Sequence, residues 1–194
     1  LAERLNALYP GDFEKKSMFF SAGGEAVENA IKIARYATKR SALITFTNGY
    51  HGRSYMGMAL SARMVPFKQG FGPFPGEIYR LPFPDDFRGI TLDQTKQAFE
   101  TLFRSDCPPD QIAAIFVEPV QGEGGYNIAT AEFLAYLRGL CDAHGIVLVA
   151  DEIQSGIGRT GKMFALEHFG IDADLTCVGK SIGGGLPISG IVGK

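Results

Sequence analysis

The sequence predicts an α/β fold in which a mostly parallel central sheet is flanked by helices. Short, continuous apolar runs alternate along the chain with longer segments in which apolar residues recur every three or four positions. Continuous apolar runs are typical of strands buried on both faces, which occur in parallel sheets covered by helices. The alternation of the two patterns indicates βαβ units. A chain of 194 residues is long enough for one substantial core, and we find no repeat or linker that divides it.

Each predicted strand is one of these apolar runs. The strands are expected at Met18–Ser21 (MFFS), Ala42–Phe46 (ALITF), Ile112–Glu118 (IAAIFVE), Ile146–Ala150 (IVLVA), Leu175–Gly179 (LTCVG) and Ile188–Gly193 (ISGIVG). The helices are expected at Gly24–Arg40, Thr91–Arg104 and Thr130–Gly145. In the first helix, Val27, Ala30, Ile31 and Ala34 are spaced as on one helix face. Gly145 stands where a glycine commonly ends a helix.

The segment from Val65 to Phe87 fits neither pattern. It contains five prolines and five phenylalanines. It is too aromatic to be disordered. We therefore expect an ordered excursion that packs on the domain or on a partner subunit, and a plain surface loop is the alternative.

Composition excludes several classes of protein. The net charge of −2 gives no electrostatic basis for binding nucleic acid or an anionic membrane. No apolar run is long enough to span a membrane, and the first residues lack the pattern of a signal peptide. The cysteines, Cys107, Cys141 and Cys177, are odd in number and widely spaced. This spacing favours a reducing compartment and small buried residues over disulfides or a zinc site.

The candidate site lies just beyond the predicted strands, because ligands bind at the carboxyl ends of strands in open parallel sheets. The residues found there, in chain order, include Gly23, Gly24, Tyr50, His51, Arg53, Glu118, Glu123, Asp151, Ile153, Gln154 and Lys180. This set is rich in groups that carry charge and contains no cluster typical of a metal site.

Lys180 has three possible roles. Gly179-Lys180-Ser181 is the tripeptide that ends a P-loop, but that motif requires glycine where this chain has Asp174, so the P-loop interpretation fails. A covalent role suits Lys180 better, because a partly desolvated lysine at the end of a buried strand can attack a carbonyl group. Asp151, which follows another buried strand, requires a cationic or hydrogen-bonding partner. The alternative is that Asp151 and Lys180 simply pair with each other.

The remaining groups suit pyridoxal 5'-phosphate (PLP). Backbone N–H groups of Gly23 and Gly24 at a helix start could bind its phosphate. Tyr50 and Ile153 could lie against the two faces of its ring. Gln154 could contact the phenolic oxygen, and a protonated pyridine nitrogen would be a partner for Asp151.

Five motifs, in this order, resemble the class III (ω-amino-acid) aminotransferases, which are fold-type I PLP enzymes. The motifs are GGEAVENAIKIAR, YHGRS, VEPVQGEGG, LVADEIQSGIGRTG and DLTCVGKSIGGGLPISG. The resemblance covers essentially the whole chain and is greatest to the members that act on 4-aminobutyrate. It implies the large, PLP-binding domain of that fold over residues 1–194, without the family's N-terminal segment and C-terminal small domain.

The resemblance implies roles at the cofactor. Lys180 would carry PLP as a Schiff base and then move a proton between the substrate carbon and the cofactor. Asp151 would hold the pyridinium nitrogen, which makes the ring an electron sink. The roles of Gln154, Ile153, Tyr50, Gly23 and Gly24 would be those given above. The family often has serine where this chain has Gly24, so one side-chain contact to the phosphate would be missing.

The resemblance also implies roles at the substrate. Arg53 matches the arginine that grips the carboxylate of the ω-amino acid. Glu123 matches a glutamate that pairs with a mobile arginine in the C-terminal part of the family's longer chains. His51, which we group with the cofactor-binding residues, and Glu118 match positions behind the residues that contact the ligands.

The implied reaction moves the amino group of 4-aminobutyrate to 2-oxoglutarate, giving succinate semialdehyde and glutamate. Ornithine, acetylornithine or β-alanine aminotransferase is the runner-up, because the HGR and QGEGG motifs occur there too. A non-catalytic cofactor-domain fragment is the alternative from a different class. The resemblance further implies a cytoplasmic homodimer or dimer of dimers whose partners are small amino and 2-oxo acids, with no nucleic acid and no membrane.

Overall fold

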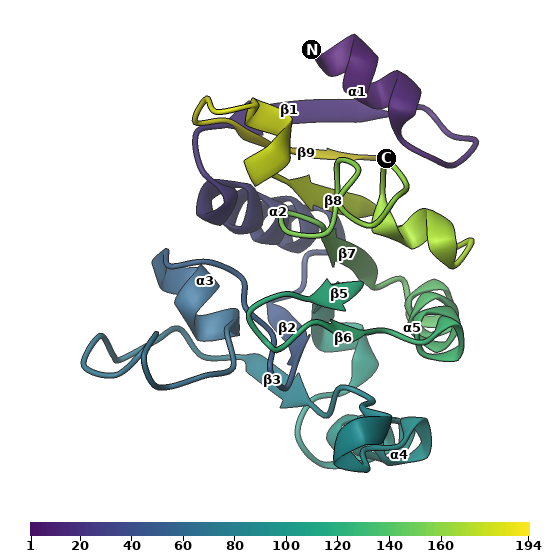
Figure 1. The fold of residues 1–194 in the computed structure, drawn as a ribbon. Helices are drawn as coiled ribbons and strands as arrows, with labels where there is room; N and C mark the ends of the chain where they lie inside the picture. Colours follow the sequence, from purple (N-terminus) through teal and green to yellow (C-terminus); the bar gives the residue numbers. More distant parts are fainter.

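A computed structural model describes all residues, 1–194 (Figure 1). Its centre is a seven-stranded sheet in the order β1-β9-β8-β7-β4-β2-β3. These strands are β1 (Lys16–Phe20), β2 (Ala42–Phe46), β3 (Ile78–Leu81), β4 (Ile112–Val117), β7 (Val147–Asp151), β8 (Leu175–Val178) and β9 (Ser189–Gly193). A separate hairpin is formed by β5 (Val120–Gln121) and β6 (Asn127–Ile128). The helices are α1 (Ala2–Leu8), α2 (Gly23–Thr38), α3 (Tyr55–Leu60), α4 (Leu92–Ser105) and α5 (Ala131–His144).

The sheet is mostly parallel, as predicted. Strands β3, β2, β4, β7 and β8 pair in parallel, whereas β9 pairs antiparallel with both β8 and β1. Every predicted strand and helix is present, with ends shifted by one or two residues in most cases. The elements that the sequence did not predict are short: α1, α3, β3 and the β5–β6 hairpin.

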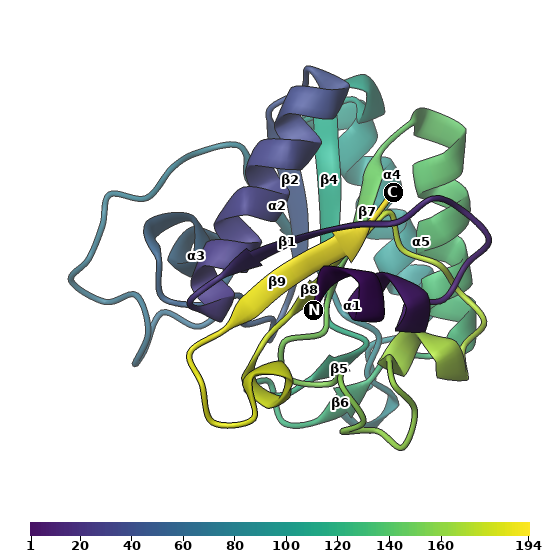
Figure 2. The ribbon, with the colours of Figure 1, turned by 90° about the horizontal axis from the view of Figure 1, so that it is seen from above.

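Helices cover both faces of the sheet (Figure 2). Helix α2 lies on one face, and α4 and α5 lie on the other (Figure 2). The side chains of β2 show why its apolar run is continuous: Leu43 packs in the cluster with α2, and the next residue, Ile44, packs in the cluster with α4 and α5. Successive residues of a strand point to opposite faces, so a strand covered on both sides needs apolar residues throughout.

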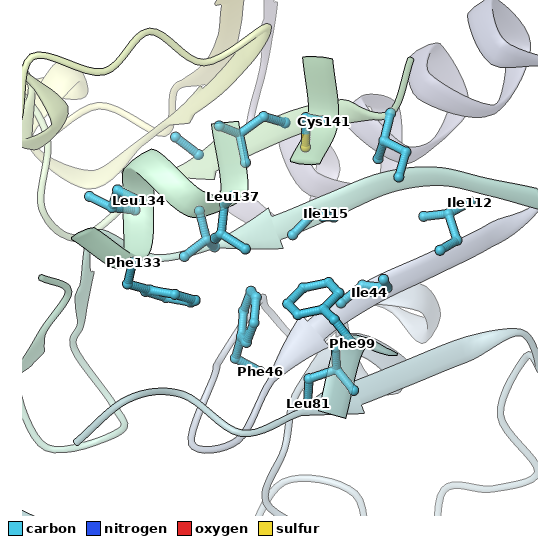
Figure 3. Packing of buried hydrophobic residues seen from close by; sticks show 14 of the residues in the cluster. Ile44, Phe46, Leu81, Phe99, Ile112, Ile115, Phe133, Leu134, Leu137 and Cys141 are labelled. Carbon is cyan, nitrogen blue, oxygen red and sulfur yellow. The ribbon is translucent and has the colours of Figure 1, made fainter. Parts of the chain in front are cut away.

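Phenylalanine rings fill the core between the sheet and helices α4 and α5 (Figure 3). The ring centroids of Phe46 and Phe133 are 5.1 Å apart, and those of Phe83 and Phe133 are 5.2 Å apart, both in edge-to-face arrangements. Phe83 belongs to the Val65–Phe87 excursion and is fully buried. The excursion also supplies β3, which pairs with β2. The prediction that it packs on the domain is therefore confirmed for the second half of the segment, whereas most side chains from Val65 to Glu77 are exposed, as the surface-loop alternative expects.

The helix ends follow the expected chemistry. Gly145 ends α5 in the left-handed conformation, with φ of 63°, as predicted. Thr130 begins the same helix and accepts a hydrogen bond from the Phe133 amide.

The three cysteines are buried and unpaired, which confirms the interpretation of them as small buried residues. None of the helices combines the length and apolar character needed to cross a membrane.

Candidate active site

A pocket of about 240 Å³ opens where β2, β4, β7 and β8 end. It is lined by Gly23, Gly24, Tyr50, His51, Gly52, Arg53, Glu118, Glu123, Asp151, Ile153, Gln154 and Lys180. The structure thus brings every residue of the predicted site to one place, together with Gly52, which stands between His51 and Arg53. Parallel strands place their carboxyl ends at the same edge of the sheet, which is why segments far apart in the sequence meet here.

A buried ion pair forms the floor of the pocket. Asp151 is the last residue of β7, and its Oδ2 accepts a hydrogen bond from His51 Nδ1 at 2.8 Å. The Ile153 amide donates to the other oxygen at 3.2 Å. Burial lowers the pKa of His51. The hydrogen bond and charge of Asp151, together with the charge of Glu118, have a larger and opposite effect, so the pKa of His51 is raised overall. The alternative that Asp151 pairs with Lys180 is wrong, because the buried acid is already partnered by His51.

Glu118 joins two loops of the pocket wall. It follows β4, is buried, and accepts hydrogen bonds from the amides of Tyr50 at 2.8 Å and Gly122 at 3.2 Å. Burial raises the pKa of this carboxyl to about 7, with the charge of His51 opposing the shift and that of Asp151 adding to it. Glu118 therefore fixes the backbone of Tyr50, a residue that the sequence predicts against the cofactor ring.

Lys180 lies at the mouth of the pocket with an exposed side chain. The expectation that it is partly desolvated is wrong, because the chain leaves the sheet after Val178 and Lys180 opens a 3₁₀ helix, Lys180–Gly183, that turns away from it. Its φ is +46°, a left-handed conformation that is uncommon for a non-glycine residue and costs about 1–3 kcal/mol. The turn is held by Arg159, whose Nε donates to Ser181 Oγ at 2.7 Å.

Two glycines begin α2 beside the pocket. The first amides of a helix have no acceptor within the helix, and we find no hydrogen bond from the Gly23 or Gly24 amide to other parts of the chain. A Cβ on Gly23 would lie 3.0 Å from Ile153 Cδ1, so only glycine fits there without a shift. A Cβ on Gly24 would meet Ser54 Oγ at 3.5 Å, an ordinary contact.

The walls carry two charged side chains without ion-pair partners. Arg53 and Glu123 are both exposed and line the pocket, and neither forms an ion pair within the chain. The Arg53 guanidinium instead lies 5.0 Å from the ring centroid of Phe67. Gln154, also in the pocket lining, packs so closely on Gly122 that a Cβ on Gly122 would lie 2.8 Å from Gln154 Cγ. Arg53 and Glu123 are free to meet charged groups of a ligand.

Glu152, to which the sequence analysis assigns no role, supports the pocket from behind. This buried residue stands between Asp151 and Ile153, and its carboxylate accepts hydrogen bonds from the amides of Ala165 at 2.6 Å and Leu166 at 3.0 Å. Burial raises its pKa to about 7 against these hydrogen bonds. The alternation of side chains along an extended segment could have shown that Glu152 points away from Asp151.

Comparisons with known proteins agree in one family. Residues 1–194 match the family model described as Aminotransferase class-III. The chain is 51% identical to the 5-aminovalerate aminotransferase of Pseudomonas putida and 48% identical to the 4-aminobutyrate aminotransferase of Escherichia coli, each over 194 residues, with 100% of the chain and 46% of the relative covered. The chain spans about half the length of these curated relatives.

Solved structures show the same likeness. A transaminase from the marine bacterium Virgibacillus has a TM-score of 0.91 at 28% identity, covering 100% of the chain and 44% of that structure. An amine transaminase from an uncultivated Pseudomonas species, in the PLP-bound (internal aldimine) form, has a TM-score of 0.86 at 29% identity, covering 100% and 46%.

Proposed function

The chain belongs to the class-III aminotransferase family, and from that premise we propose that this protein is a PLP-dependent transaminase that moves the amino group of 4-aminobutyrate to 2-oxoglutarate. The products are succinate semialdehyde and glutamate. One observation carries the proposal: a single pocket holds an unpaired lysine, a buried acid, two helix-start glycines and an arginine without an ion-pair partner. The names of the two relatives, which act on 4-aminobutyrate and 5-aminovalerate, support an ω-amino acid as donor.

The residues of the pocket fit PLP. The free amides of Gly23 and Gly24 suit a phosphate, since a helix N-terminus favours an anion. Gly23 and Gly179 both leave room for Ile153, because a Cβ on either would lie within 3.0 or 3.1 Å of its side chain. Ile153 and Tyr50 both line the pocket. In the proposal, Ile153 would be the apolar surface for one face of the ring, and Tyr50 would be the aromatic residue for the other. When bound, PLP supplies an electron-withdrawing ring that stabilises negative charge on the substrate carbon.

Asp151 and Lys180 have different tasks in this proposal. Asp151 would hold the pyridine nitrogen, and His51 orients the Asp151 carboxylate through the 2.8 Å hydrogen bond. Lys180 Nζ would hold PLP through its aldehyde carbon, and, once the substrate amine has displaced it, the freed amine would take the proton from the substrate carbon and return it. An exposed lysine without an ion-pair partner is free for both steps.

Arg53 and Glu123 serve the substrate. Arg53 binds the carboxylate of the ω-amino acid, remote from the reacting amine, and Glu123 pairs with a further arginine of the whole protein. A donor longer by one methylene, 5-aminovalerate, is a second candidate because the relative that is 51% identical is named for it. Ornithine, acetylornithine and β-alanine remain candidates within the class. The homodimer, the cytoplasmic location and the assignment of residues 1–194 to a large cofactor domain stay predictions.

The proposal is tested on protein expressed from the complete coding sequence. With PLP, 4-aminobutyrate and 2-oxoglutarate, we expect glutamate and succinate semialdehyde in equal amounts. Borohydride reduction followed by peptide mass spectrometry should place PLP on Lys180. Lys180→Ala should abolish both the PLP adduct and the formation of products. Lys32→Ala, on the surface of α2, is the control and should change neither the adduct nor the activity. An adduct on another lysine, or no amino transfer, contradicts the proposal.

Two further measurements refine the assignment. Arg53→Ala should raise the KM for 4-aminobutyrate, and an unchanged KM would remove the ω-amino acid from the proposal. The same assays on residues 1–194 alone test the alternative that this chain is a non-catalytic cofactor-domain fragment: PLP on Lys180 without turnover would support it.

A further inference from the structure

Arg53 has one partner in the chain. Its side chain is exposed and forms no ion pair or side-chain hydrogen bond, and the guanidinium carbon lies 5.0 Å from the ring centroid of Phe67. A long exposed side chain without a partner moves among many rotamers, and ordering it costs free energy. The Phe67 ring is therefore the surface that restrains where the guanidinium lies at the pocket.

Phe67 is itself held in place from two sides. Its ring packs on Tyr50, with centroids 4.9 Å apart and an interplanar angle of 58°. The next residue, Lys68, is buried, and its Nζ donates to the Ser61 carbonyl at 3.1 Å, where Arg80 also donates at 3.0 Å. Lys68 thus ties the backbone next to Phe67 to the residue that follows α3, and Arg80 of β3 holds the same carbonyl group. The Phe67 ring is therefore restrained by its contact with Tyr50 and by the anchored residue that follows it.

Tyr50 connects this contact to the cofactor side of the pocket. Its amide donates to the buried Glu118 carboxylate at 2.8 Å, which fixes its backbone. Phe67 therefore lies against one residue predicted to face the PLP ring and one predicted to bind the substrate carboxylate, although it does not line the pocket itself. Because the Phe67 ring contacts both residues, it relates the position of the Arg53 guanidinium to the position of Tyr50.

We propose that Phe67 is a positioning residue that holds the Arg53 guanidinium at a fixed place and so selects the length of the ω-amino acid donor. The inference rests on the proposed function. 4-Aminobutyrate and 5-aminovalerate differ by one methylene between amine and carboxylate. A fixed guanidinium binds the carboxylate of one length better, and a pocket discriminates a methylene by about 10- to 200-fold. A mobile guanidinium accepts both lengths.

The first test compares donors in the enzyme from the complete coding sequence. In Phe67→Ala, we expect the KM of the preferred donor to rise about two- to fivefold, the size of an exposed cation–π contact. The ratio of kcat/KM between 4-aminobutyrate and 5-aminovalerate should move toward one, with a smaller change in kcat. Phe67→Tyr keeps a ring and should restore the wild-type values. Phe71→Ala is the matched control, because this exposed ring of the same segment does not line the pocket.

The second test needs no turnover. Butyrate and valerate carry the carboxylate without the amine, so their dissociation constants, measured by calorimetry on the PLP-loaded protein, report on Arg53 alone. Phe67→Ala should weaken both about two- to fivefold. If wild-type protein transfers no amino group, the proposed function fails while this measurement still tests Phe67. If Phe67→Ala matches wild type in KM and in both dissociation constants, while Arg53→Ala does not, the inference about Phe67 is overturned.

Discussion

Replacing Glu152 by glutamine should change how the stability of this protein depends on pH. The Glu152 carboxyl is buried behind the pocket, without a cationic partner, and burial raises its pKa from 4.5 to about 7. Between these values the folded protein holds a proton that the unfolded chain has released. The contribution of Glu152 to the free energy of unfolding is therefore fully present below pH 4.5 and is lost as pH rises through about 7.

The magnitude follows from the two pKa values. One pKa unit corresponds to about 1.4 kcal/mol, so the contribution of Glu152 falls by roughly 2.5 kcal/mol between pH 5 and pH 8. Glutamine does not titrate, so Glu152→Gln removes this component. Glutamine also offers one oxygen to the two amides of Ala165 and Leu166, which costs about 1.5–3 kcal/mol at all pH values. The variant should therefore be less stable than wild type at both pH values, and its deficit in the free energy of unfolding should be larger at pH 5 than at pH 8 by roughly 2.5 kcal/mol.

The assay is urea unfolding followed by circular dichroism at pH 5 and pH 8, on protein from the complete coding sequence. Glu152→Ala is the matched variant: it loses both hydrogen bonds, so it should be less stable than Glu152→Gln, yet show the same change relative to wild type between the two pH values. Hydrogen exchange at Ala165 and Leu166 gives a local readout and should be faster in both variants. If wild type and both variants have parallel pH dependences, Glu152 does not titrate as described and the argument is refuted.

Two other substitutions test the site itself. Gly24→Ser adds a hydroxyl beside the predicted phosphate position, where a Cβ meets Ser54 Oγ at an ordinary 3.5 Å, so PLP should bind at least about tenfold more tightly in equilibrium dialysis. Gly23→Ser is the control: its Cβ would lie 3.0 Å from Ile153 Cδ1, so affinity should fall, and equal effects at both positions would contradict the assignment. His51→Phe leaves the buried Asp151 without its partner and should lower the free energy of unfolding by about 3–5 kcal/mol. Because the pKa of His51 is raised from 6.5, the loss should be largest below that pH and shrink as pH rises through the raised pKa, and a loss that grows with pH would contradict the pairing.

The strand ends of this chain were predictable because a strand buried on both faces needs apolar residues throughout, so the apolar run ends where the strand ends. An apolar run such as ALITF stops where the chain leaves the core, and the parallel arrangement then brings the residues after each run to one edge. This reasoning placed Asp151 and Lys180 at the same pocket. It did not identify the partner of Asp151, since His51 is 100 residues away in the chain and no local pattern states which cation faces the acid.

The short elements and the supporting residues were not predictable for a related reason. Strand β3 has four residues in a proline-rich segment, and it forms because β2 offers an open edge. Lys180 is exposed because of the left-handed turn it opens, which depends on contacts with Arg159 and Ser181. Phe67 reaches Arg53 only when the excursion folds back along α3. Each of these features depends on tertiary contacts, which cannot be predicted from the spacing of apolar residues along the chain.

The pocket is built from two kinds of support, and this division has a functional consequence. Asp151 and Ile153 stand at the end of a buried strand, where moving either would disturb the core, and the His51 pair makes such movement costly. Arg53, by contrast, is exposed and restrained by one ring contact worth about 0.5–1 kcal/mol. Substitutions around Arg53 should therefore alter the proposed binding of the carboxylate at little cost to the fold. The proposed cofactor chemistry and the proposed choice of donor are thus held by separate sets of contacts, so donor length can change while the chemistry at Lys180 stays the same.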